Sequence, residues 1–333
     1  MWQMSSKQVL VIALQSDLHA DSVISCLNKK GVDVFRIDPT VDDDLPDKIS
    51  IISSPTIEAC YEFIRNEKFY PLNCKGVFCR FTIDLLIPSS DDPLINFTSA
   101  ESLTAFLAPL KMIESSRWIN DPWIESRADC KIMQSKIAKE IGLNIPEFIV
   151  SSNYYDLLSF YNEYKNVIIK PLSDTTLALV DNFFIKQEDL LTDNFRAPYT
   201  AKFVPDENID IKNVDNTPTL LQEEIIKKSD IRATVIDDKV FTVEMPYNED
   251  NPIDFRLNKN EKINEYHLPD EINEKLIKLA KTLNLRFASC DLVLDKDNQI
   301  YFLESNVQGN WLWTEINENM NISEAIADAL ITS

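Results

Sequence analysis

Residues 287–313 have the sequence FASCDLVLDKDNQIYFLESNVQGNWLW, which alternates like two strands around a polar turn. Asp297 and Asn298 both tolerate a positive φ, so they can form a two-residue hairpin turn. Counting outward from that turn places Asp291 directly opposite Glu304 on the facing strand. Like charges that face each other across a strand pair repel, so we expect something to hold this pair in place. The same count pairs Val293 with Phe302 and Leu292 with Leu303.

A metal site is one explanation for the acidic pair. Asn306 lies two residues after Glu304 and therefore on the same face of its strand. Two carboxylates and an amide oxygen suit a hard cation such as Mg²⁺, which prefers oxygen ligands and commonly binds phosphates as well. The alternative is an exposed hairpin whose acidic side chains face water. The spacing of these residues does not decide between the two.

The composition limits the partners of the chain. Asp and Glu outnumber Lys and Arg by 54 to 33, which gives a net charge of −21. Such a surface repels nucleic-acid phosphates and anionic membranes, so we expect neither nucleic acid nor membrane as a partner. No stretch approaches the ~18 apolar residues of a membrane span, and the N-terminus does not resemble a signal peptide. The six cysteines contain no CxxC pair, which favours reduced thiols in the cytoplasm over a zinc site or a disulfide framework.

The chain has 333 residues, enough for two or three domains. Only four of these residues are glycines, which excludes a GxGxxG loop and a Walker loop. A nucleotide would therefore bind in another way.

The first third of the chain predicts an open α/β subdomain. The pattern indicates a buried strand over residues 8–14, a helix over 20–29 and a second strand over 32–38, which together form a parallel β-α-β unit. His19 lies in the loop after the first strand, where it either contacts a ligand or, as such residues more often do, caps the helix. Residues 76–81 predict a further strand with Arg80 at its end.

Two lysines lie at the ends of predicted elements. Lys131 lies early in a helix that Gly142 ends, and on its own it would be a solvated surface lysine. Lys170 ends a short apolar strand, residues 164–171, whose neighbours hold it toward the interior or the mouth of a cleft. The SDTT segment that follows could cover a phosphate with backbone amides and hydroxyls, and a plain polar loop fits equally well.

A hairpin over residues 231–245 carries further charged residues, with its turn at 237–238. Asp230 and Arg232 alternate onto one face of its first strand. Arg232, and Arg256 in the later Asp-Phe-Arg segment, are of the type that binds phosphate or carboxylate bidentately beside a cleft. A final amphipathic helix is predicted over residues 322–331.

These parts resemble, in their order, the ATP-grasp fold of carboxylate ligases. The resemblance is closer to the microviridin-type peptide ligases, which make ω-ester or ω-amide rings in ribosomal peptides (graspetides). It is carried by SDLHADSVISCLNKKGVDVFRID, VFCRF, WINDPWIESRADCKIMQSKIAKEIGLNIPEFIVSSN, IIKPL, LLQEEIIKKSDIRATVIDDKVF, DFR and LESNVQGNWLW, which span nearly the whole chain.

The resemblance implies an α/β (α+β) architecture in three parts. These are an N-terminal open α/β pre-ATP-grasp domain over residues 1–120, a central ATP-grasp subdomain over 121–220, and a C-terminal antiparallel-sheet subdomain with the metal site over 221–333.

The resemblance also implies a role for each matching residue. ATP binding falls to Lys131, Lys170, Glu223, Glu224, Ile225 and Asp230, binding of two Mg²⁺ ions to Asp291, Glu304 and Asn306, and catalysis to Arg232 and Arg256. The two lysines would neutralise the ATP phosphates, residues 223–225 would form the hinge that holds adenine, and the two arginines would face the γ-phosphate and the substrate carboxylate. The chain departs from the family where SDTT replaces a loop that commonly has glycine, and where the usual ENP-like and GQW segments read ESN and GNW.

The implied activity is that of an ATP-dependent peptide macrocyclase. It would phosphorylate Asp or Glu side chains of a ribosomal precursor peptide with a leader segment and condense them with Ser or Thr hydroxyls or Lys amines. A homodimer is compatible with the resemblance, and so is a monomer. One alternative is an ATP-grasp ligase that joins an amine or amino acid to a small carboxylate. Another is a non-catalytic ATP-grasp protein that binds a nucleotide or a peptide.

Overall fold

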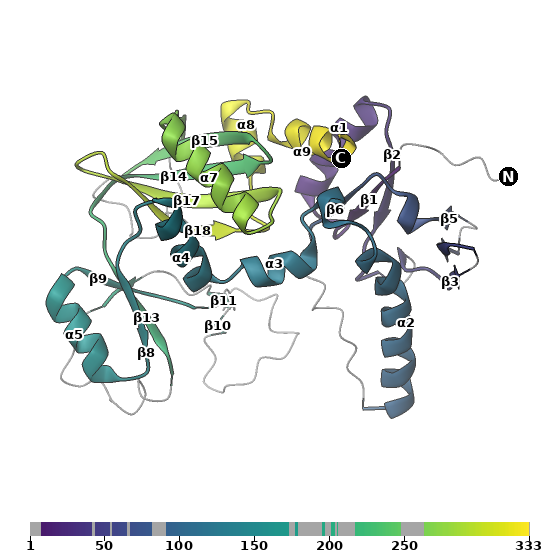
Figure 1. Ribbon diagram of the computed structural model, residues 1–333, viewed down its shortest axis with the longest axis horizontal. Coiled ribbons are helices and arrows are strands. Elements are labelled where there is room, and N and C mark those ends of the chain that lie inside the picture. Colours follow the sequence, from purple (N-terminus) through teal and green to yellow (C-terminus); the bar gives the residue numbers. More distant parts are fainter. Residues whose placement is uncertain are drawn as a thin grey trace.

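The structure is a computed structural model with three main sheets. In Figure 1 the N-terminal sheet lies on the right, the C-terminal sheet at the upper left and the central sheet below it. It describes residues 8–41, 44–53, 55–64, 67–81, 91–172, 177–178, 195–196, 201–203, 205, 217–247 and 263–332. Within these ranges, no helix is long and apolar enough to cross a membrane.

The N-terminal sheet is parallel and has the strand order β2-β1-β6-β7. Its strands are β1 (Gln8–Ile12), β2 (Asp33–Ile37), β6 (Gly76–Cys79) and β7 (Trp118–Ile119). Residues 9–12 of β1 are all apolar and buried, as expected for a strand that is covered on both faces. Val9 and Val11 pack toward α1 (Leu18–Lys29) and α9 (Ile322–Ile331), and Leu10 and Ile12 pack toward α2 (Pro93–Lys111). The predicted α/β beginning of the chain is confirmed.

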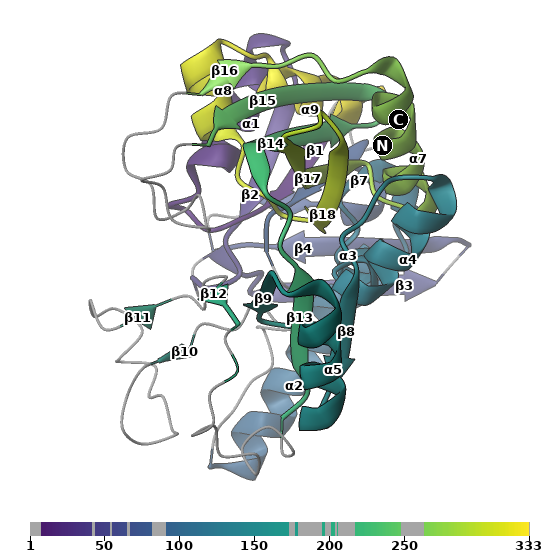
Figure 2. The same cartoon turned by 90° about the vertical axis from the view of Figure 1, so that its left-hand side faces the viewer.

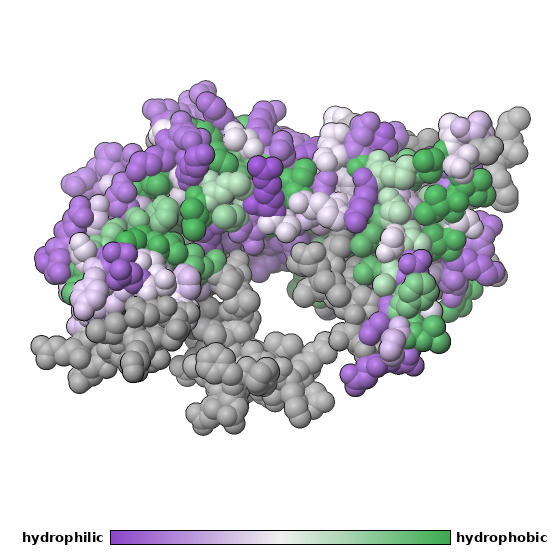
Figure 3. Space-filling model, turned by 60° about the horizontal axis from the view of Figure 1, so that its bottom comes forward, coloured by the Kyte–Doolittle hydropathy of each residue, from purple (hydrophilic) through white to green (hydrophobic). Residues whose placement is uncertain are grey.

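A small antiparallel sheet, β3 (Lys48–Ser53), β4 (Ile57–Glu62) and β5 (Lys68–Phe69), lies on the α2 side. It is followed by the short 3-10 helix η2 (Pro71–Asn73). The first turns of α2 extend beyond this packing and expose Leu94, Ile95 and Phe97. Apolar surface is visible over this part of the molecule in Figure 3.

Helix α1 begins two residues earlier than predicted, because Asp17 caps it. The Asp17 carboxylate accepts hydrogen bonds from the backbone N–H groups of His19, at 2.8 Å, and Ala20, at 3.0 Å. The prediction that His19 caps the helix is therefore wrong. Its ring instead lies against the Trp311 ring, with centroids 4.4 Å apart, and burial lowers the pKa of His19 to about 4.

The central sheet has the order β12-β9-β13-β8, and its pairs are antiparallel. Its strands are β8 (Phe148–Ser151), β9 (Val167–Lys170), β12 (Ala201–Lys202) and β13 (Thr219–Glu223). Helix α5 (Tyr154–Tyr164) packs Leu157 and Phe160 against it. The pair β10 (Leu177–Ala178) and β11 (Phe195–Arg196) lies beside this sheet (Figure 2).

The C-terminal sheet is antiparallel, with the order β16-β15-β14-β17-β18. Its strands are β14 (Lys227–Ile236), β15 (Lys239–Pro246), β16 (Asn264–Glu265), β17 (Phe287–Asp295) and β18 (Ile300–Asn306). Helices α4 (Lys131–Ile141) and α7 (Asp270–Thr282) bury one face, where alternate residues of β14 and β17 are apolar. Among the described residues, further helical segments are η4 (Ser115–Arg117), α3 (Pro122–Ala128) and α8 (Leu312–Glu318). The opposite face of the sheet carries the polar residues of the candidate site.

The hairpin between β17 and β18 has a three-residue loop, 296–298, in place of the predicted two-residue turn. Asn298 adopts a φ of 60°, and the Asp295 N–H donates to the Gln299 carbonyl at 2.9 Å. A tight turn that ends in one left-handed residue produces this loop length. The pairing therefore moves by one residue, and the predicted partners of Leu292 and Val293 are wrong: they pair with Phe302 and Tyr301.

A β-bulge at Leu303 moves the register back by one residue. Asp291 is consequently the direct partner of Glu304, which confirms that pairing. The loop and the bulge together therefore place the two acidic residues opposite each other. The predicted register is wrong between the loop and the bulge, and it is correct for Asp291 and Glu304.

The side chain of Asn120 joins the N-terminal and C-terminal sheets. Its oxygen accepts from the backbone N–H groups of Arg286, at 3.0 Å, and Phe287, at 2.9 Å. Its nitrogen donates to the carbonyls of Phe287 and Val307 and to Glu125. Asn120 is only 3% exposed, so water cannot replace these bonds.

We predict that Asn120→Ala lowers the free energy of unfolding by about 3 kcal/mol, because several buried backbone groups lose their partners at once. Urea unfolding followed by circular dichroism measures the change. The matched control is Asn317→Ala, which removes an exposed amide that donates only to the Trp313 carbonyl and should cost less than about 0.5 kcal/mol. Similar losses in the two variants would contradict this role for Asn120.

Candidate functional site

Three charged side chains on the polar face of the C-terminal sheet form a row with Lys131, which comes from helix α4. Arg232 on β14 is the register partner of Asp291 on β17, which is the partner of Glu304 on β18. Arg232 Nε lies 3.0 Å from Asp291 Oδ1, and Lys131 Nζ lies 3.3 Å from Glu304 Oε2. The order of charges is therefore plus, minus, minus, plus. The two cations hold the acidic pair, and repulsion alone does not require a metal there.

The third predicted metal ligand, Asn306, is held against the same pair. Its amide nitrogen donates to Asp291 Oδ2 at 3.1 Å, so the amide oxygen is the atom left to accept a hydrogen bond or bind a cation. The donor set of two carboxylates and one amide oxygen fits a hard cation such as Mg²⁺. Among the described residues, no group of three or more His, Cys, Asp or Glu side chains forms a metal site.

Burial raises the pKa of Asp291 to about 6. The charge of Arg232 acts in the opposite direction and favours the ionised form, while Glu304 and Asp230 oppose ionisation and Lys170 favours it. The position of Asp291 is therefore one where added positive charge stabilises the carboxylate.

The two predicted phosphate-binding lysines come from different parts of the fold and meet near this row. Lys131 is the first residue of α4, and Lys170 is the last residue of β9 in the central sheet. Lys131 Nζ also donates to the Pro171 carbonyl at 3.4 Å, which ties it to the end of β9. Gly142 ends α4 with a φ of 91°, as predicted.

The predicted hinge residues connect the central and C-terminal sheets. Glu223 ends β13, and Glu224 and Ile225 lie in the segment that leads to β14 (Figure 2). The Glu223 N–H donates to the Glu147 carbonyl and the Glu224 N–H to the Asn166 carbonyl, both at 2.9 Å. The backbone of this segment is thus fixed to the central sheet on one side.

Asp230 lies near the start of β14, on the same face as Arg232, and forms an ion pair of 2.5 Å with Lys227. Arg256, the other predicted catalytic arginine, lies outside the described residues.

Sequence reasoning did not identify Ser289 or Glu125. Ser289 is fully buried on β17, and its hydroxyl accepts a hydrogen bond of 3.1 Å from Arg232 Nη1. Glu125 on α3 accepts from Gln308 at 2.7 Å and from Asn120 at 3.2 Å. Burial raises the pKa of Glu125 to about 8. The local sequence carries no signal for either residue, because Arg232, the partner of Ser289, and Gln308, a partner of Glu125, are distant in the chain.

Comparison with known proteins gives the class of this chain. The RimK-like ATP-grasp domain matches residues 128–330, more than half of the chain, which therefore belongs to the RimK-like ATP-grasp family. No curated protein matches the sequence.

Solved structures share the fold over nearly the whole chain. A Chryseobacterium gregarium RiPP-associated ATP-grasp ligase, in complex with ADP and a leader and core peptide, has 21% identity over 98% of this chain and 97% of that chain, with a TM-score of 0.81. Macrocyclase MdnC from Microcystis aeruginosa MRC, bound with precursor peptide MdnA, has 21% identity over 98% of this chain and 100% of that chain, with a TM-score of 0.74. ATP-grasp ligase PsnB, complexed with minimal precursor, Mg and ADP, has 20% identity over 97% of each chain and a TM-score of 0.71. The fold is the expected α/β ATP-grasp fold.

The buried Glu125 predicts a pH effect on stability. Its carboxyl ionises near its ordinary pKa of 4.5 when unfolded and near 8 when folded, so its contribution to stability is complete below 4.5 and is lost as the pH rises through 8. We expect the stability of Glu125→Gln relative to the wild type to increase between about pH 5 and pH 8. Urea unfolding at several pH values measures this difference. A difference that stays constant with pH would show that Glu125 is ionised in the folded protein.

Proposed function

We propose that this chain is an ATP-dependent ligase that forms macrocycles in a ribosomal precursor peptide. The observation that carries the proposal is the row of Arg232, Asp291, Glu304 and Lys131, in which two carboxylates on one sheet face lie between two cations. Such a row suits the binding of a nucleotide triphosphate with its metal. Membership of the RimK-like ATP-grasp family supports a carboxylate ligase.

In the proposed reaction, a side-chain carboxylate oxygen of a peptide Asp or Glu attacks the γ-phosphorus of ATP. The bond to the β-phosphate oxygen breaks, giving an acylphosphate and ADP. A Ser or Thr hydroxyl, or a Lys amine, of the same peptide then attacks the activated carbonyl. Its proton is lost and phosphate leaves, so each ring forms with the net loss of one water.

The chain's own residues would act mainly through charge and position. Lys131 and Lys170 would bind the phosphates, and Arg232, together with Arg256, would face the transferred phosphoryl group and the substrate carboxylate. Asp291, Glu304 and Asn306 would hold Mg²⁺, two ions in our proposal. Bound there, the metal would supply positive charge that offsets the charge developing on the phosphoryl group.

Adenine would bind at the segment between the central and C-terminal sheets. The N–H groups of Glu223 and Glu224 already donate to carbonyls of the central sheet, so the base edge would be read by carbonyl groups here or by the backbone of Ile225. Asp230 would lie at the ATP-facing start of β14. In this proposal residues 1–120, 121–220 and 221–333 form the N-terminal, central and C-terminal units, with the central one closing over the acylphosphate to exclude water.

A peptide substrate with a leader segment is supported by the shared fold. The similar ligases were crystallised with leader and core peptides or with a precursor peptide, and the likeness extends over nearly the full length of this chain. A small carboxylate with a free amine as co-substrate is the alternative that the next experiment separates.

We predict that a short peptide encoded beside the gene for this chain loses the mass of one water per ring when incubated with the protein, ATP and Mg²⁺. Intact-mass spectrometry measures the loss, and omission of ATP is the control. If the peptide is unchanged and ATP is consumed only after free amino acids or amines are added, the substrate is a small molecule and the macrocyclase proposal fails.

We also predict that Asp291→Ala and Glu304→Ala each lower the rate of ring formation by about 100-fold or more, because each removes a proposed metal ligand. Rates of ADP release and of mass loss measure the effect. The matched control is Asp297→Ala, which removes an exposed acid in the loop of the same hairpin and should leave both rates unchanged. Wild-type turnover in either active-site variant would contradict the metal assignment.

A further inference from the structure

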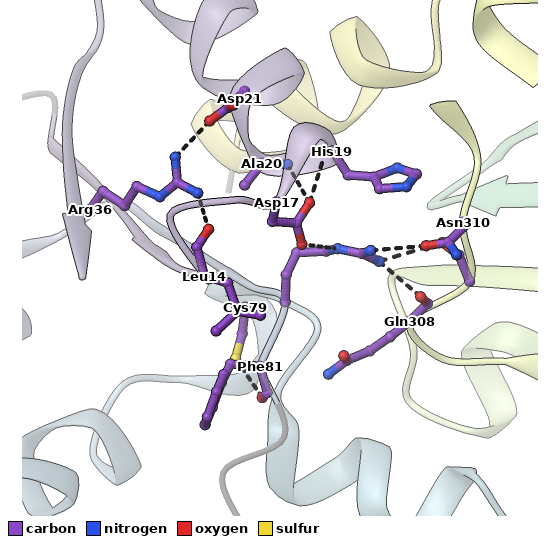
Figure 4. A network of polar contacts seen from close by, with 12 residues as sticks. Leu14, Asp17, His19, Ala20, Asp21, Arg36, Cys79, Phe81, Gln308 and Asn310 are labelled. Carbon is purple, nitrogen blue, oxygen red and sulfur yellow. Dashed lines mark hydrogen bonds and ion pairs between the residues drawn. The ribbon is translucent and has the colours of Figure 1, made fainter. Parts of the chain in front are cut away.

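Arg80, which directly follows β6, connects the N-terminal sheet to the loop that follows β18. Three of its partners, Asp17, Gln308 and Asn310, are labelled in Figure 4. Its Nε lies 3.2 Å from an oxygen of Asp17. Its Nη1 donates to the carbonyls of Gln308, at 2.8 Å, and Gly309, at 3.4 Å, and its Nη2 donates to the Asn310 side chain at 3.2 Å. The Arg80 side chain is only 9% exposed, and its contacts with Asp17, Gln308 and Gly309 are partly buried. The contact with Asn310 is exposed.

The loop that Arg80 holds comes directly after Asn306, a proposed metal ligand. Trp311, which is fully buried, follows the loop. Its ring centroid lies 5.0 Å from the Arg80 Cζ atom, so the guanidinium stacks over the ring. The loop is therefore fixed at its far end by an aromatic side chain and in its middle by one arginine.

Gly309, in the middle of this loop, packs directly against Ser289 on the polar face of the sheet. A Cβ on Gly309 would lie 2.3 Å from Ser289 Cβ, so the loop backbone rests directly on that side chain. The Ser289 hydroxyl in turn accepts from Arg232 Nη1, and Arg232 Nε pairs with Asp291. A continuous path of contacts thus runs from Arg80 to Asp291.

We propose that Arg80 is a positioning residue for the Mg²⁺–nucleotide site. It keeps Gly309 against Ser289 and thereby fixes Arg232 and Asn306 around Asp291, although Arg80 itself does not touch that row. This inference rests on the proposed function, since it concerns the same site. The N-terminal sheet would then contribute to nucleotide binding through the loop 307–310.

Arginine is the residue type that this position requires. Its planar guanidinium donates to a carboxylate, two carbonyls and an amide oxygen at once. A lysine carries its donors on a single nitrogen and cannot reach all four acceptors together. The other carboxylate oxygen of Asp17 accepts the hydrogen bonds from the N-terminus of α1, so removal of the Arg80 guanidinium should leave that helix capped.

Arg36 provides a matched control in the same sheet. It lies on β2, pairs with Asp21 on α1 at 2.6 Å and donates to the Leu14 carbonyl, so it also joins a strand to α1. Within the part of the chain that the structure describes, its side chain makes no hydrogen bond or ion pair to the loop after β18. Figure 4 shows Arg36 with Asp21 and Leu14, and in the same view Asp17, Gln308 and Asn310, which are partners of Arg80.

The test is calorimetric titration of Mg²⁺ and ADP into the wild type, Arg80→Gln, Arg80→Lys and Arg36→Gln. We expect Arg80→Gln to weaken binding about tenfold, Arg80→Lys to recover part of the loss, and Arg36→Gln to bind like the wild type. Amide hydrogen exchange without ligand should be faster over residues 303–311 in Arg80→Gln alone. Gly309→Ala, which displaces Ser289 while leaving Arg80 in place, is the second variant if Arg80→Gln does not fold, and it should weaken binding similarly.

A double-mutant cycle with Ser289→Ala tests the path itself. If Arg80 acts through Ser289, the loss in Arg80→Gln combined with Ser289→Ala is smaller than the product of the two single losses. Independent effects would overturn the path, as would unchanged binding in Arg80→Gln or equal losses in Arg80→Gln and Arg36→Gln. A wild type that does not bind Mg²⁺ and ADP at all would instead overturn the proposed function.

Discussion

The juxtaposition of Asp291 and Glu304 across β17 and β18 is the constraint on which the site depends. Two carboxylates in register repel each other, and burial already raises the pKa of Asp291 to about 6. Arg232 and Lys131 offset this repulsion from the two ends of the row. The opposite charges in the row balance one another, and the oxygen donors still lie together on one face, as the proposed metal-assisted phosphoryl transfer requires.

The row joins parts that are far apart in the chain, so the fold has to bring them together. Lys131 begins a helix that packs on the apolar face of the C-terminal sheet, while Lys170 ends a strand of the central sheet. The last helix, α9, returns to the N-terminal sheet and packs against α1. With Asn120 and Arg80, this gives the N-terminal sheet three separate attachments to the segments around β17 and β18. The site is therefore a product of the whole fold.

Local patterns in the sequence were sufficient to predict the β-α-β beginning, the helix that Gly142 ends, and the strand before Lys170, because each depends on neighbours in the chain. The pairing of Asp291 with Glu304 was also predicted correctly. The prediction used a turn that is one residue too short and lacked the bulge at Leu303, and these two errors shift the register in opposite directions and cancel. The contacts of Arg80 with the loop after β18, 228 residues away, could not be predicted, because no local pattern encodes them. The same holds for the burial of Glu125. The predicted role of Arg256 stays a prediction, since that residue lies outside the described ranges.

The most direct test of the central claim is calorimetric titration of ATP into the wild-type protein with and without Mg²⁺. If Asp291, Glu304 and Asn306 form a metal site between cationic side chains, ATP should bind tightly only when Mg²⁺ is present, and Asp291→Asn should remove most of that dependence. Equal affinity for ATP with and without Mg²⁺ would contradict the claim, because the acidic pair would then have no role in binding the nucleotide.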